Sequence, residues 1–295
     1  MPRITNDDDP RRRVSVRWRE ACREEQEALM TDGDDAARSE LAPARLFSCA
    51  GQVAIVTGGT SGIGRAAAEA MAAAGARVLL VGLPAGDPDG VAAVMRTQGL
   101  EVHGLEADVT ADGAAAAMVA AALDRWGRLD TVVANAGAAL DEPGPIDLGE
   151  LDRMYALHVR SVAALANAAV PVVAEHGGGT FLVMSSLAGL RGNRVLSGYG
   201  MTKAANAQLA RNLAVQWGPH GVRANAISPG VIETDFARPI TEDASLAAVR
   251  RERTPLRRFG RVEEVAGAVV WLASSAGAFV TGQNIVIDGG TLIAD

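Results

Sequence analysis

Short apolar segments alternate with stretches of helix length from Gly51 to the end of the chain, and this alternation constrains the fold more than any other feature of the sequence. The apolar segments are continuous runs rather than alternating apolar and polar residues, which is typical of strands buried on both faces of a parallel sheet. Strands are predicted at residues 53–57, 78–81, 102–105, 131–134, 180–184, 222–227 and 285–287. Alanine-rich or amphipathic segments such as 65–74 and 148–174 predict the helices between them. We therefore expect one α/β domain with a doubly wound, mostly parallel, Rossmann-like sheet of about seven strands and helices on both faces.

Residues 1–49 differ from the rest of the chain. They contain three consecutive arginines at 11–13, many acidic side chains and little apolar periodicity. We predict a charged, flexible N-terminal extension at 1–49 and a dinucleotide-binding catalytic domain at 50–295, with a regulatory or oligomer-clasping arm as the alternative for the extension. Three aspartates at 7–9 stand where the apolar core of a secretory signal would begin, so we expect a cytoplasmic location.

Composition narrows the range of partners. The formal net charge of −7 argues against a general binder of nucleic acid or of anionic membranes. The longest apolar-looking stretch, 162–174, is interrupted by Asn167 and Pro171 and is too short to span a bilayer. Neither Cys22 nor Cys49 sits in a metal-ligand spacing. We expect a small-molecule substrate, and no nucleic-acid, membrane or metal partner.

A glycine-rich turn follows the first predicted strand directly. Glycines let the backbone turn sharply, and in a doubly wound sheet a dinucleotide pyrophosphate rests at this turn on the N-terminus of a helix. The spacing is Gly-x-x-x-Gly-x-Gly, and a plain connecting turn is the alternative. The candidate cofactor-binding residues here are Gly58, Thr60, Ser61, Gly62, Ile63 and Gly64.

Tyr199 and Lys203 form the candidate acid/base pair. They are four residues apart in a segment predicted to be helical to about residue 217, so their side chains share one helix face. A nearby cation stabilises a phenolate and lowers the pKa of a tyrosine toward the working range of an acid/base catalyst. Lys203 is the single lysine among 28 basic residues, and Tyr199 is one of two tyrosines.

Ser185 and Ser186 follow the predicted strand at 180–184. Doubly wound sheets place their ligands at the carboxyl ends of strands. A hydroxyl there can donate a hydrogen bond to a substrate oxygen as the charge on that oxygen changes. A serine pair that caps the strand end is the alternative.

Together these residues resemble the short-chain dehydrogenase/reductase family over about residues 47–292. The resemblance includes the cofactor loop at 57–64 and the catalytic set Ser186, Tyr199 and Lys203. It also includes the adenine contact Asp108 and Val109, the turn Asn135, Ala136 and Gly137, and the nicotinamide-side loop with Pro229, Gly230, Ile232 and Thr234. Residues 281–283 and 288–290 resemble the closing strand of the family.

The resemblance implies an NAD(P)-dependent oxidoreductase that transfers a hydride between nicotinamide and a secondary alcohol or ketone. Tyr199 would exchange a proton with the substrate oxygen, and Ser186 would orient and polarise that oxygen. Lys203 would hold the nicotinamide ribose hydroxyls and lower the pKa of Tyr199. The resemblance also implies a homotetramer, and the apolar residues at 291–294 would suit burial between subunits.

One departure from the family pattern lies in the helix after the fourth strand. The family usually carries an asparagine there, which links the lysine to solvent through water, whereas this chain has His158. Histidine both donates and accepts hydrogen bonds and is therefore a candidate for the same relay. The alternative is that His158 fits the helix and the relay is weaker or altered.

A second departure bears on the cofactor. NAD-preferring members of the family usually carry an acidic residue at the end of the second strand, where this chain has Gly82 followed by Leu83 and Pro84. No basic residue typical of NADP-preferring members stands there either, and Asp87 is a candidate contact to the ribose. The absence of a phosphate-binding cation favours NAD over NADP.

Two other outcomes remain open at this point. One is a catalytically weak or inactive nucleotide-binding scaffold or sensor, which the intact set Ser186, Tyr199 and Lys203 argues against. The other is an epimerase or dehydratase that uses the same site. Residues 237–254, where the family keeps its substrate lid, mix apolar and charged side chains. Steroids, sugars, acyl thioesters and small secondary alcohols all stay possible as substrates.

Overall fold

The structure is a computed structural model that describes residues 41–139 and 144–294. The chain divides into two units, Met1–Leu46 and Phe47–Asp295. Residues 41–46 of the first unit are described and include the one-turn helix α3 (Pro43–Leu46). The flexible extension expected at residues 1–49 falls largely outside the described residues and stays a prediction.

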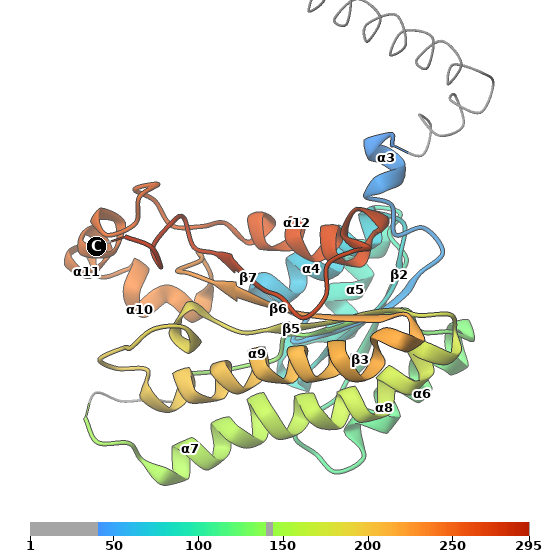
Figure 1. Cartoon of the computed structure of the whole chain (residues 1–295), viewed down its shortest axis with the longest axis horizontal. Coiled ribbons are helices and arrows are strands. Elements are labelled where there is room, and N and C mark those ends of the chain that lie inside the picture. Colours follow the sequence, from blue (N-terminus) through green and yellow to red (C-terminus); the bar gives the residue numbers. More distant parts are fainter. Residues whose placement is uncertain (1–40, 140–143, 295) are drawn as a thin grey trace, which may run out of the picture. The chain divides into compact units, whose positions relative to one another are not determined.

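A seven-stranded sheet forms the centre of the second unit (Figure 1), in the order β3-β2-β1-β4-β5-β6-β7. Every neighbouring pair is parallel. The strands are β1 (Val53–Thr57), β2 (Arg77–Gly82), β3 (Val102–Glu106), β4 (Thr131–Ala134), β5 (Gly179–Met184), β6 (Val222–Pro229) and β7 (Asn284–Ile287). Each predicted strand is present, and the predicted doubly wound α/β fold is confirmed.

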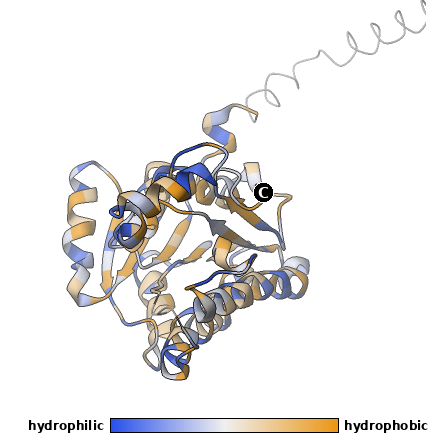
Figure 2. Ribbon diagram, turned by 90° about the vertical axis from the view of Figure 1, so that its left-hand side faces the viewer, coloured by the Kyte–Doolittle hydropathy of each residue, from blue (hydrophilic) through white to orange (hydrophobic). Residues whose placement is uncertain are grey.

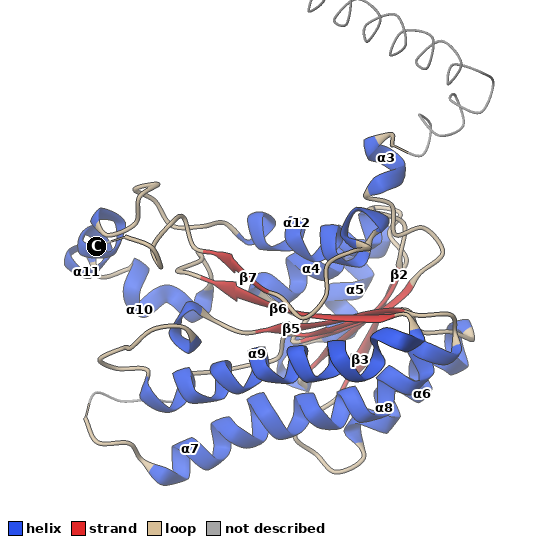
Figure 3. Cartoon of the chain, in the orientation of Figure 1, coloured by secondary structure: helices blue, strands red, loops and turns tan. Residues whose placement is uncertain are grey.

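Helices cover both faces of the sheet (Figures 1 and 3). One layer consists of α4 (Gly62–Ala73), α5 (Pro88–Thr97) and α12 (Val262–Ala273), and the other of α6 (Ala114–Trp126), α8 (Ser161–Glu175) and α9 (Ser197–Trp217). The strands between the layers carry mostly hydrophobic residues (Figure 2). Two apolar clusters result, one on each face, as continuous apolar strands require.

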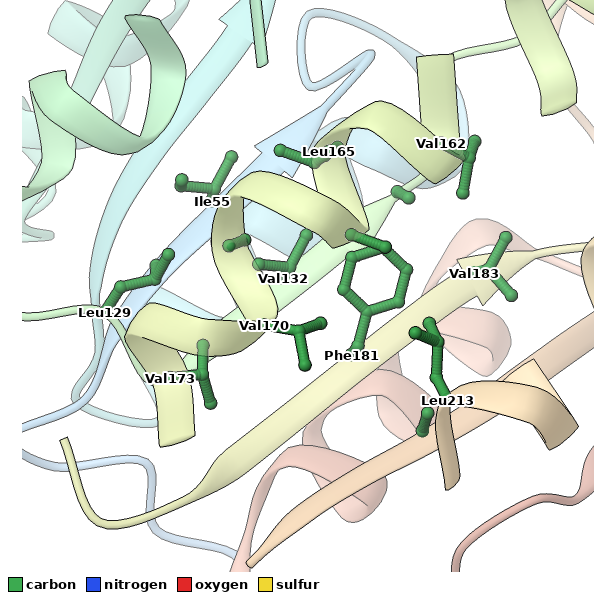
Figure 4. Packing of buried hydrophobic residues seen from close by; sticks show 14 of the residues in the cluster. Ile55, Leu129, Val132, Val162, Leu165, Val170, Val173, Phe181, Val183 and Leu213 are labelled. Atoms are coloured by element: carbon green, nitrogen blue, oxygen red, sulfur yellow. The ribbon is translucent and has the colours of Figure 1, made fainter. Parts of the chain in front are cut away.

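Phe181 on β5 lies at the centre of one cluster and is 1% exposed. Val132 on β4, Val170 on α8 and Leu213 on α9 surround its ring (Figure 4). Truncation of such a ring to alanine costs about 3–5 kcal/mol of folding free energy. This packing fixes β5 and α9, the two elements that carry the candidate catalytic residues.

The helix predicted at 148–174 is present but not uniform. It consists of α7 (Leu148–Tyr155), one π-helical turn (Ala156–Arg160) and α8. A π turn adds one residue to the helical repeat and redirects the side chains that follow it. Among the described residues, the helix from Leu148 to Glu175 is the one segment whose length and composition would allow it to cross a membrane. Its apolar side chains pack against the sheet, as expected for a core helix.

The order of the strands locates the ligand crevice. Strand β1 lies between β2 and β4, and the chain crosses from β3 on one side of β1 to β4 on the other. In an open parallel sheet this reversal leaves a crevice at the carboxyl ends of the two strands. The turn after β1 and the turn after β4 therefore border the expected binding site. Shorter helices α10 (Arg238–Thr241) and α11 (Ala244–Glu252) follow β6 at the same edge.

Candidate active site

The glycine-rich turn connects β1 to α4 at this edge. Gly58 and Gly62 have φ values of +64° and +52°, a left-handed conformation that favours glycine. A Cβ at Gly64 would lie 2.1 Å from the Gly58 carbonyl oxygen and 2.4 Å from Asn135 Nδ2. Ser61 is the N-cap of α4 and makes no side-chain capping hydrogen bond. The first turn of α4 therefore keeps backbone N–H groups available to an anion.

Asn135, predicted as a cofactor contact, braces the glycine turn with its side chain. Its Nδ2 donates to the carbonyl oxygens of Thr57 at 3.0 Å and Gly58 at 3.2 Å. In return, Thr57 Oγ1 accepts hydrogen bonds from the backbone N–H groups of Asn135 and Ala136. The turn after β4 and the turn after β1 thus hold one another in position.

Thr60 gives a physical reason for the glycine at the end of β2. A Cβ at Gly82 would lie 2.5 Å from Thr60 Cγ2, and a Cβ at Gly86 would lie 2.6 Å from Thr60 Oγ1. The acidic residue usual in NAD-preferring members would therefore collide with Thr60 at position 82. Asp87, the other candidate contact to the ribose, accepts a hydrogen bond from Gly90 N at 3.0 Å and caps helix α5.

Asp108 and Val109 follow β3, two strands away from β1. The Thr110 hydroxyl and backbone N–H both donate to Asp108 Oδ1, and they hold the pKa of that carboxyl below its ordinary value. Val109 packs against the apolar cluster. These residues lie on the side of the crevice away from Tyr199, where the far end of an extended ligand would reach.

Helix α9 and the turn after β5 approach one another closely. That turn is a short 3₁₀ helix, Leu187–Gly189, with Ser186 as its N-cap. A Cβ at Gly189 would lie 2.7 Å from Ala204 N on α9, and a Cβ at Gly200 would lie 2.7 Å from the Ala188 carbonyl oxygen. The two glycines permit the approach that brings Ser186 to Tyr199.

Ser186, Tyr199 and Lys203 meet at the start of α9. The Ser186 side chain forms a hydrogen bond with Tyr199. Lys203 Nζ lies 5.4 Å from the centroid of the Tyr199 ring and donates to the Met184 carbonyl oxygen at 2.8 Å. Tyr199 and Lys203 are 7% and 3% exposed. The three residues predicted as the catalytic set therefore form one cluster, in which Tyr199 and Lys203 are buried and Ser186 is half-buried.

Burial controls the protonation of this cluster in the absence of ligand. It raises the pKa of Tyr199 to about 12, and the hydrogen bond from Ser186 opposes that rise. Burial also lowers the pKa of Lys203 to about 7. Both shifts disfavour the charged form, as expected for groups removed from water.

The loop after β6 covers the start of α4. A Cβ at Gly62 would lie 3.3 Å from Thr234 Cγ2, and Thr234 Oγ1 donates to the Ile232 carbonyl oxygen at 3.2 Å. Ile232 is buried, and a Cβ at Gly230 would lie 2.8 Å from Asp288 Cβ. The predicted nicotinamide-side residues, Pro229, Gly230, Ile232 and Thr234, thus border the same crevice as the glycine turn.

His158 lies inside the cluster and has no exposed surface. Its Nε2 accepts a hydrogen bond from Ala138 N at 3.1 Å, and its Nδ1 lies 2.9 Å from Thr202 Oγ1. Its ring meets the Tyr199 ring edge to face, with centroids 5.4 Å apart. Burial, with a smaller effect of the Lys203 charge, lowers the pKa of His158 to about 3.

Sequence reasoning missed two residues of this cluster, Thr202 and Phe236. The Phe236 ring lies 5.9 Å from the Tyr199 ring, and the Thr202 hydroxyl donates to the Tyr199 carbonyl oxygen at 2.8 Å. Thr202 precedes Lys203 directly, so its place on the predicted helix was a usable signal. Phe236 follows an irregular loop and carried no such signal. The described residues contain no group of three or more His, Cys, Asp or Glu side chains placed to hold a metal ion.

Comparison with known proteins identifies the class. A family model described as enoyl-(acyl carrier protein) reductase matches residues 58–291. An uncharacterised oxidoreductase from Mycobacterium tuberculosis is 37% identical over 249 residues, which cover 83% of this chain and 94% of that protein. The chain belongs to the short-chain dehydrogenase/reductase family.

Solved structures agree with this assignment. A gluconate 5-dehydrogenase from Burkholderia cenocepacia, in complex with NADP and tartrate, is similar with a TM-score of 0.82 and 28% identity over 85% of this chain and 99% of that chain. A 7α-hydroxysteroid dehydrogenase complexed with NADH and 7-oxo glycochenodeoxycholic acid is similar with a TM-score of 0.80 and 30% identity. The match covers 83% of this chain and 96% of that chain. The protein is an NAD(P)-dependent dehydrogenase/reductase acting on CH–OH and C=O groups.

Proposed function

We propose that the protein oxidises a secondary alcohol or reduces the corresponding ketone, with Tyr199 as the general acid/base. The observation that carries this proposal is the hydrogen bond between the half-buried Ser186 and the buried Tyr199, next to the Lys203 ammonium. A phenol at a carboxyl strand edge, with a hydroxyl donor beside it, can exchange a proton with a substrate oxygen. Ser186 would orient that oxygen and stabilise the charge that develops on it.

The crevice fits a nicotinamide dinucleotide. A Cβ at Gly58 or Gly64 would collide with Asn135, so both glycines let the turn after β4 pack against the glycine turn. The first turn of α4 then offers N–H groups to phosphate. One of the three N–H groups of Lys203 donates to the Met184 carbonyl oxygen, and the other two remain to donate to ribose hydroxyls. Asp108 and Val109 would contact the adenine end, and Gly137 and residues 229–234 the nicotinamide end. When bound, the nicotinamide supplies or accepts the hydride.

Ligand contacts to Lys203 would prepare Tyr199 for proton exchange. Each hydrogen bond from Nζ to a bound acceptor favours the ammonium form and so raises the pKa of Lys203 above about 7. The resulting cation, close to the Tyr199 ring, favours the phenolate and lowers the pKa of Tyr199 from about 12. The acid/base group is therefore activated mainly in the liganded protein.

We also propose that NAD is preferred over NADP. The end of β2 carries Gly82, Leu83 and Pro84, without a cation to pair with a ribose phosphate, and Asp87 adds a negative charge nearby. A titration with NADH and with NADPH, followed by nicotinamide fluorescence, tests this. Tighter binding of NADH supports the proposal, tighter binding of NADPH contradicts the preference, and no binding of either contradicts the enzymatic function.

Tyr199→Phe tests the proposed acid/base role. We expect turnover to fall by about 10²–10⁴-fold, the usual contribution of general acid/base catalysis, while NADH binds nearly as before. Tyr155→Phe is the matched control, because Tyr155 is 54% exposed on α7. Substantial turnover by Tyr199→Phe would refute the assignment. Cofactor binding without net oxidation of any alcohol would favour the scaffold or the epimerase alternative.

For the assembly and its location we propose a cytoplasmic homotetramer. Exposed apolar side chains on α9, Val215 and Met201, and near the C-terminus, Phe279 and Ile293, support burial between copies. Sedimentation of the purified protein tests the tetramer, and a monomer at micromolar concentration would contradict it.

A further inference from the structure

His158 occupies the middle of the π turn, where its side chain reaches two other segments. Nε2 accepts the N–H of Ala138 in the loop after β4, and Nδ1 lies at hydrogen-bonding distance from Thr202 Oγ1 on α9. The loop comes close because Gly137 has no side chain: a Cβ there would lie 3.1 Å from Nε2. One fully buried imidazole thus connects three segments distant in sequence.

The hydrogen bonds determine which nitrogen carries the proton. Because Nε2 accepts from a backbone N–H, it holds a lone pair and no proton. The Thr202 hydroxyl gives its own proton to the Tyr199 carbonyl oxygen, so toward His158 it acts as an acceptor. The imidazole is therefore neutral and protonated on Nδ1, and both of its nitrogens are occupied.

A proton relay needs a nitrogen that alternately takes up and releases a proton. His158 would have to break the bond from Ala138 to accept one, in a place with no exposed surface. The titratable groups that face it, Tyr199 and Lys203, both come from α9, and a positive charge on Lys203 further opposes an imidazolium. The geometry therefore disfavours the relay that the sequence left open.

We propose instead that His158 is a positioning residue: a neutral imidazole that, through Thr202, fixes the first turn of α9 and the ring plane of Tyr199 relative to the loop after β4. The chain of hydrogen bonds runs from Nδ1–H to Thr202 and from the Thr202 hydroxyl to the carbonyl of Tyr199. The edge-to-face contact, with an interplanar angle of 86°, holds the phenol itself. This inference rests on the proposed role of Tyr199 as the acid/base.

Two pairs of variants separate the contacts. In His158→Gln the amide oxygen can reach the place of Nε2 and keep the Ala138 contact, whereas the donor to Thr202 is lost. In His158→Asn the shorter amide can keep the donor to Thr202 and loses the Ala138 contact. Thr202→Val removes the hydroxyl at nearly constant shape, and Thr202→Ser restores it as the matched control.

Spectroscopy on the ligand-free protein gives a readout that does not depend on turnover. The chain has four histidines and two tyrosines, so one variant of each assigns the relevant NMR signals. We expect His158 to show a neutral Nδ1–H tautomer from pH 5 to 9 (about the range in which a free imidazole titrates). Thr202→Val should shift the Tyr199 ring signals and leave those of Tyr155 unchanged, and Thr202→Ser should restore them.

Kinetics should separate positioning from proton transfer. We expect kcat to fall between about tenfold and a hundredfold in Thr202→Val and His158→Gln, with little change in the KM of the cofactor. The pH at which kcat changes should stay that of the wild type. The kcat of the double variant, Thr202→Val with His158→Gln, should be no lower than that of the less active single variant, because the two substitutions break the same chain of hydrogen bonds. His158→Asn, which keeps the donor, should retain more activity than His158→Gln.

A relay would give the opposite results. A His158 signal that titrates near neutral pH, or an inflection in the kcat profile that disappears in His158→Gln, would overturn the proposal. Unchanged Tyr199 signals in Thr202→Val would overturn it as well. If wild-type protein lacks turnover, the function proposed for Tyr199 fails, while the NMR signals of His158 and Tyr199 still decide the positioning role.

Discussion

Lys203 shows how narrowly one side chain is specified in this protein. It is 3% exposed, its ammonium lies against Tyr199, and it donates to the Met184 carbonyl oxygen. The Ser185 hydroxyl in turn donates to the Lys203 carbonyl oxygen at 2.7 Å, so side chain and backbone are held from the same strand end. A compact ammonium fits this place, whereas a planar guanidinium is broader and needs several acceptors in one plane.

We therefore expect Lys203→Arg to behave as a loss of function although the charge is kept. Turnover should fall by at least about a hundredfold, close to the effect of Lys203→Met, because a displaced cation no longer acts on Tyr199. Steady-state kinetics with the preferred cofactor checks this. Arg211→Lys, an exposed change on the same helix, should leave turnover unaltered; near wild-type activity in Lys203→Arg would show that charge alone suffices.

Gly64 is constrained by space rather than by backbone conformation. In Gly64→Ala the methyl group would meet the Gly58 carbonyl oxygen and the Asn135 amide, so the glycine turn must shift. We expect the Kd for NADH to rise by at least about tenfold, since phosphate binding depends on the placement of these N–H groups. Gly267→Ala on α12 meets no atom within 4 Å and should bind NADH as the wild type does. Equal affinity of both variants would contradict the role of the turn.

At the scale of the element, sequence patterns predicted the strands well because most are continuous apolar runs; β3, with His103 and Gly104, is the weakest of them. The ends depended on tertiary contacts. Strand β6 continues to Pro229, two residues beyond the prediction, because Ser228 and Pro229 pair with Val286 and Ile287 of β7. A π turn within a long helix leaves no mark in a 3.6-residue periodicity, so the family resemblance, and not the helical pattern, pointed to His158 as a site residue.

The candidate site was predicted to a similar extent. Motif spacing identified Ser186, Tyr199 and Lys203, and the structure brings them together. Motif spacing did not reveal that Asn135 braces the glycine turn with its side chain, because the backbone carbonyls that accept its hydrogen bonds carry no sequence signal. It also did not reveal the Thr60 side chain that accounts for Gly82.

The packing of the 3₁₀ turn Leu187–Gly189 against α9 can be tested at Gly189. A methyl group there would press on Ala204 N, so Gly189→Ala should move Ser186 away from Tyr199. We expect kcat to fall by about tenfold or more while the Kd for NADH changes little. Gly192→Ala, three residues later in a place with no atom within 4 Å, is the control. A Gly189→Ala protein with wild-type kcat would show that the close approach is dispensable.

At the scale of the whole molecule, buried titratable groups link stability to pH. His158 has an ordinary pKa of 6.5 and a folded pKa of about 3. Below pH 6.5 the unfolded chain binds a proton that the folded protein excludes until about pH 3. The contribution of His158 to the free energy of unfolding is therefore fully present above pH 6.5 and is lost as the pH falls from 6.5 to about 3.

We expect the free energy of unfolding to decrease on acidification, with His158 contributing up to about 1.4 kcal/mol per pH unit between its two pKa values. Urea unfolding of the wild type and of His158→Gln at several pH values measures this contribution as the difference between their slopes. Carboxyl groups such as Glu264, whose pKa is lowered to about 2, add a decrease that is common to both proteins. Identical slopes would show that His158 does not resist protonation in the fold.

The single buried lysine has a practical consequence for following this protein in solution. Lys203 is the one ε-amine in the sequence, because the other 27 of the 28 lysine and arginine residues are arginines. An amine-directed reagent can therefore react with the α-amine of the chain and with this one side chain. Modification of Lys203 therefore requires the crevice to open, and the rate of modification measures how often the crevice opens around Nζ. The protein thus carries its own site-specific probe, and reaction at the α-amine of the chain is the one background reaction to subtract.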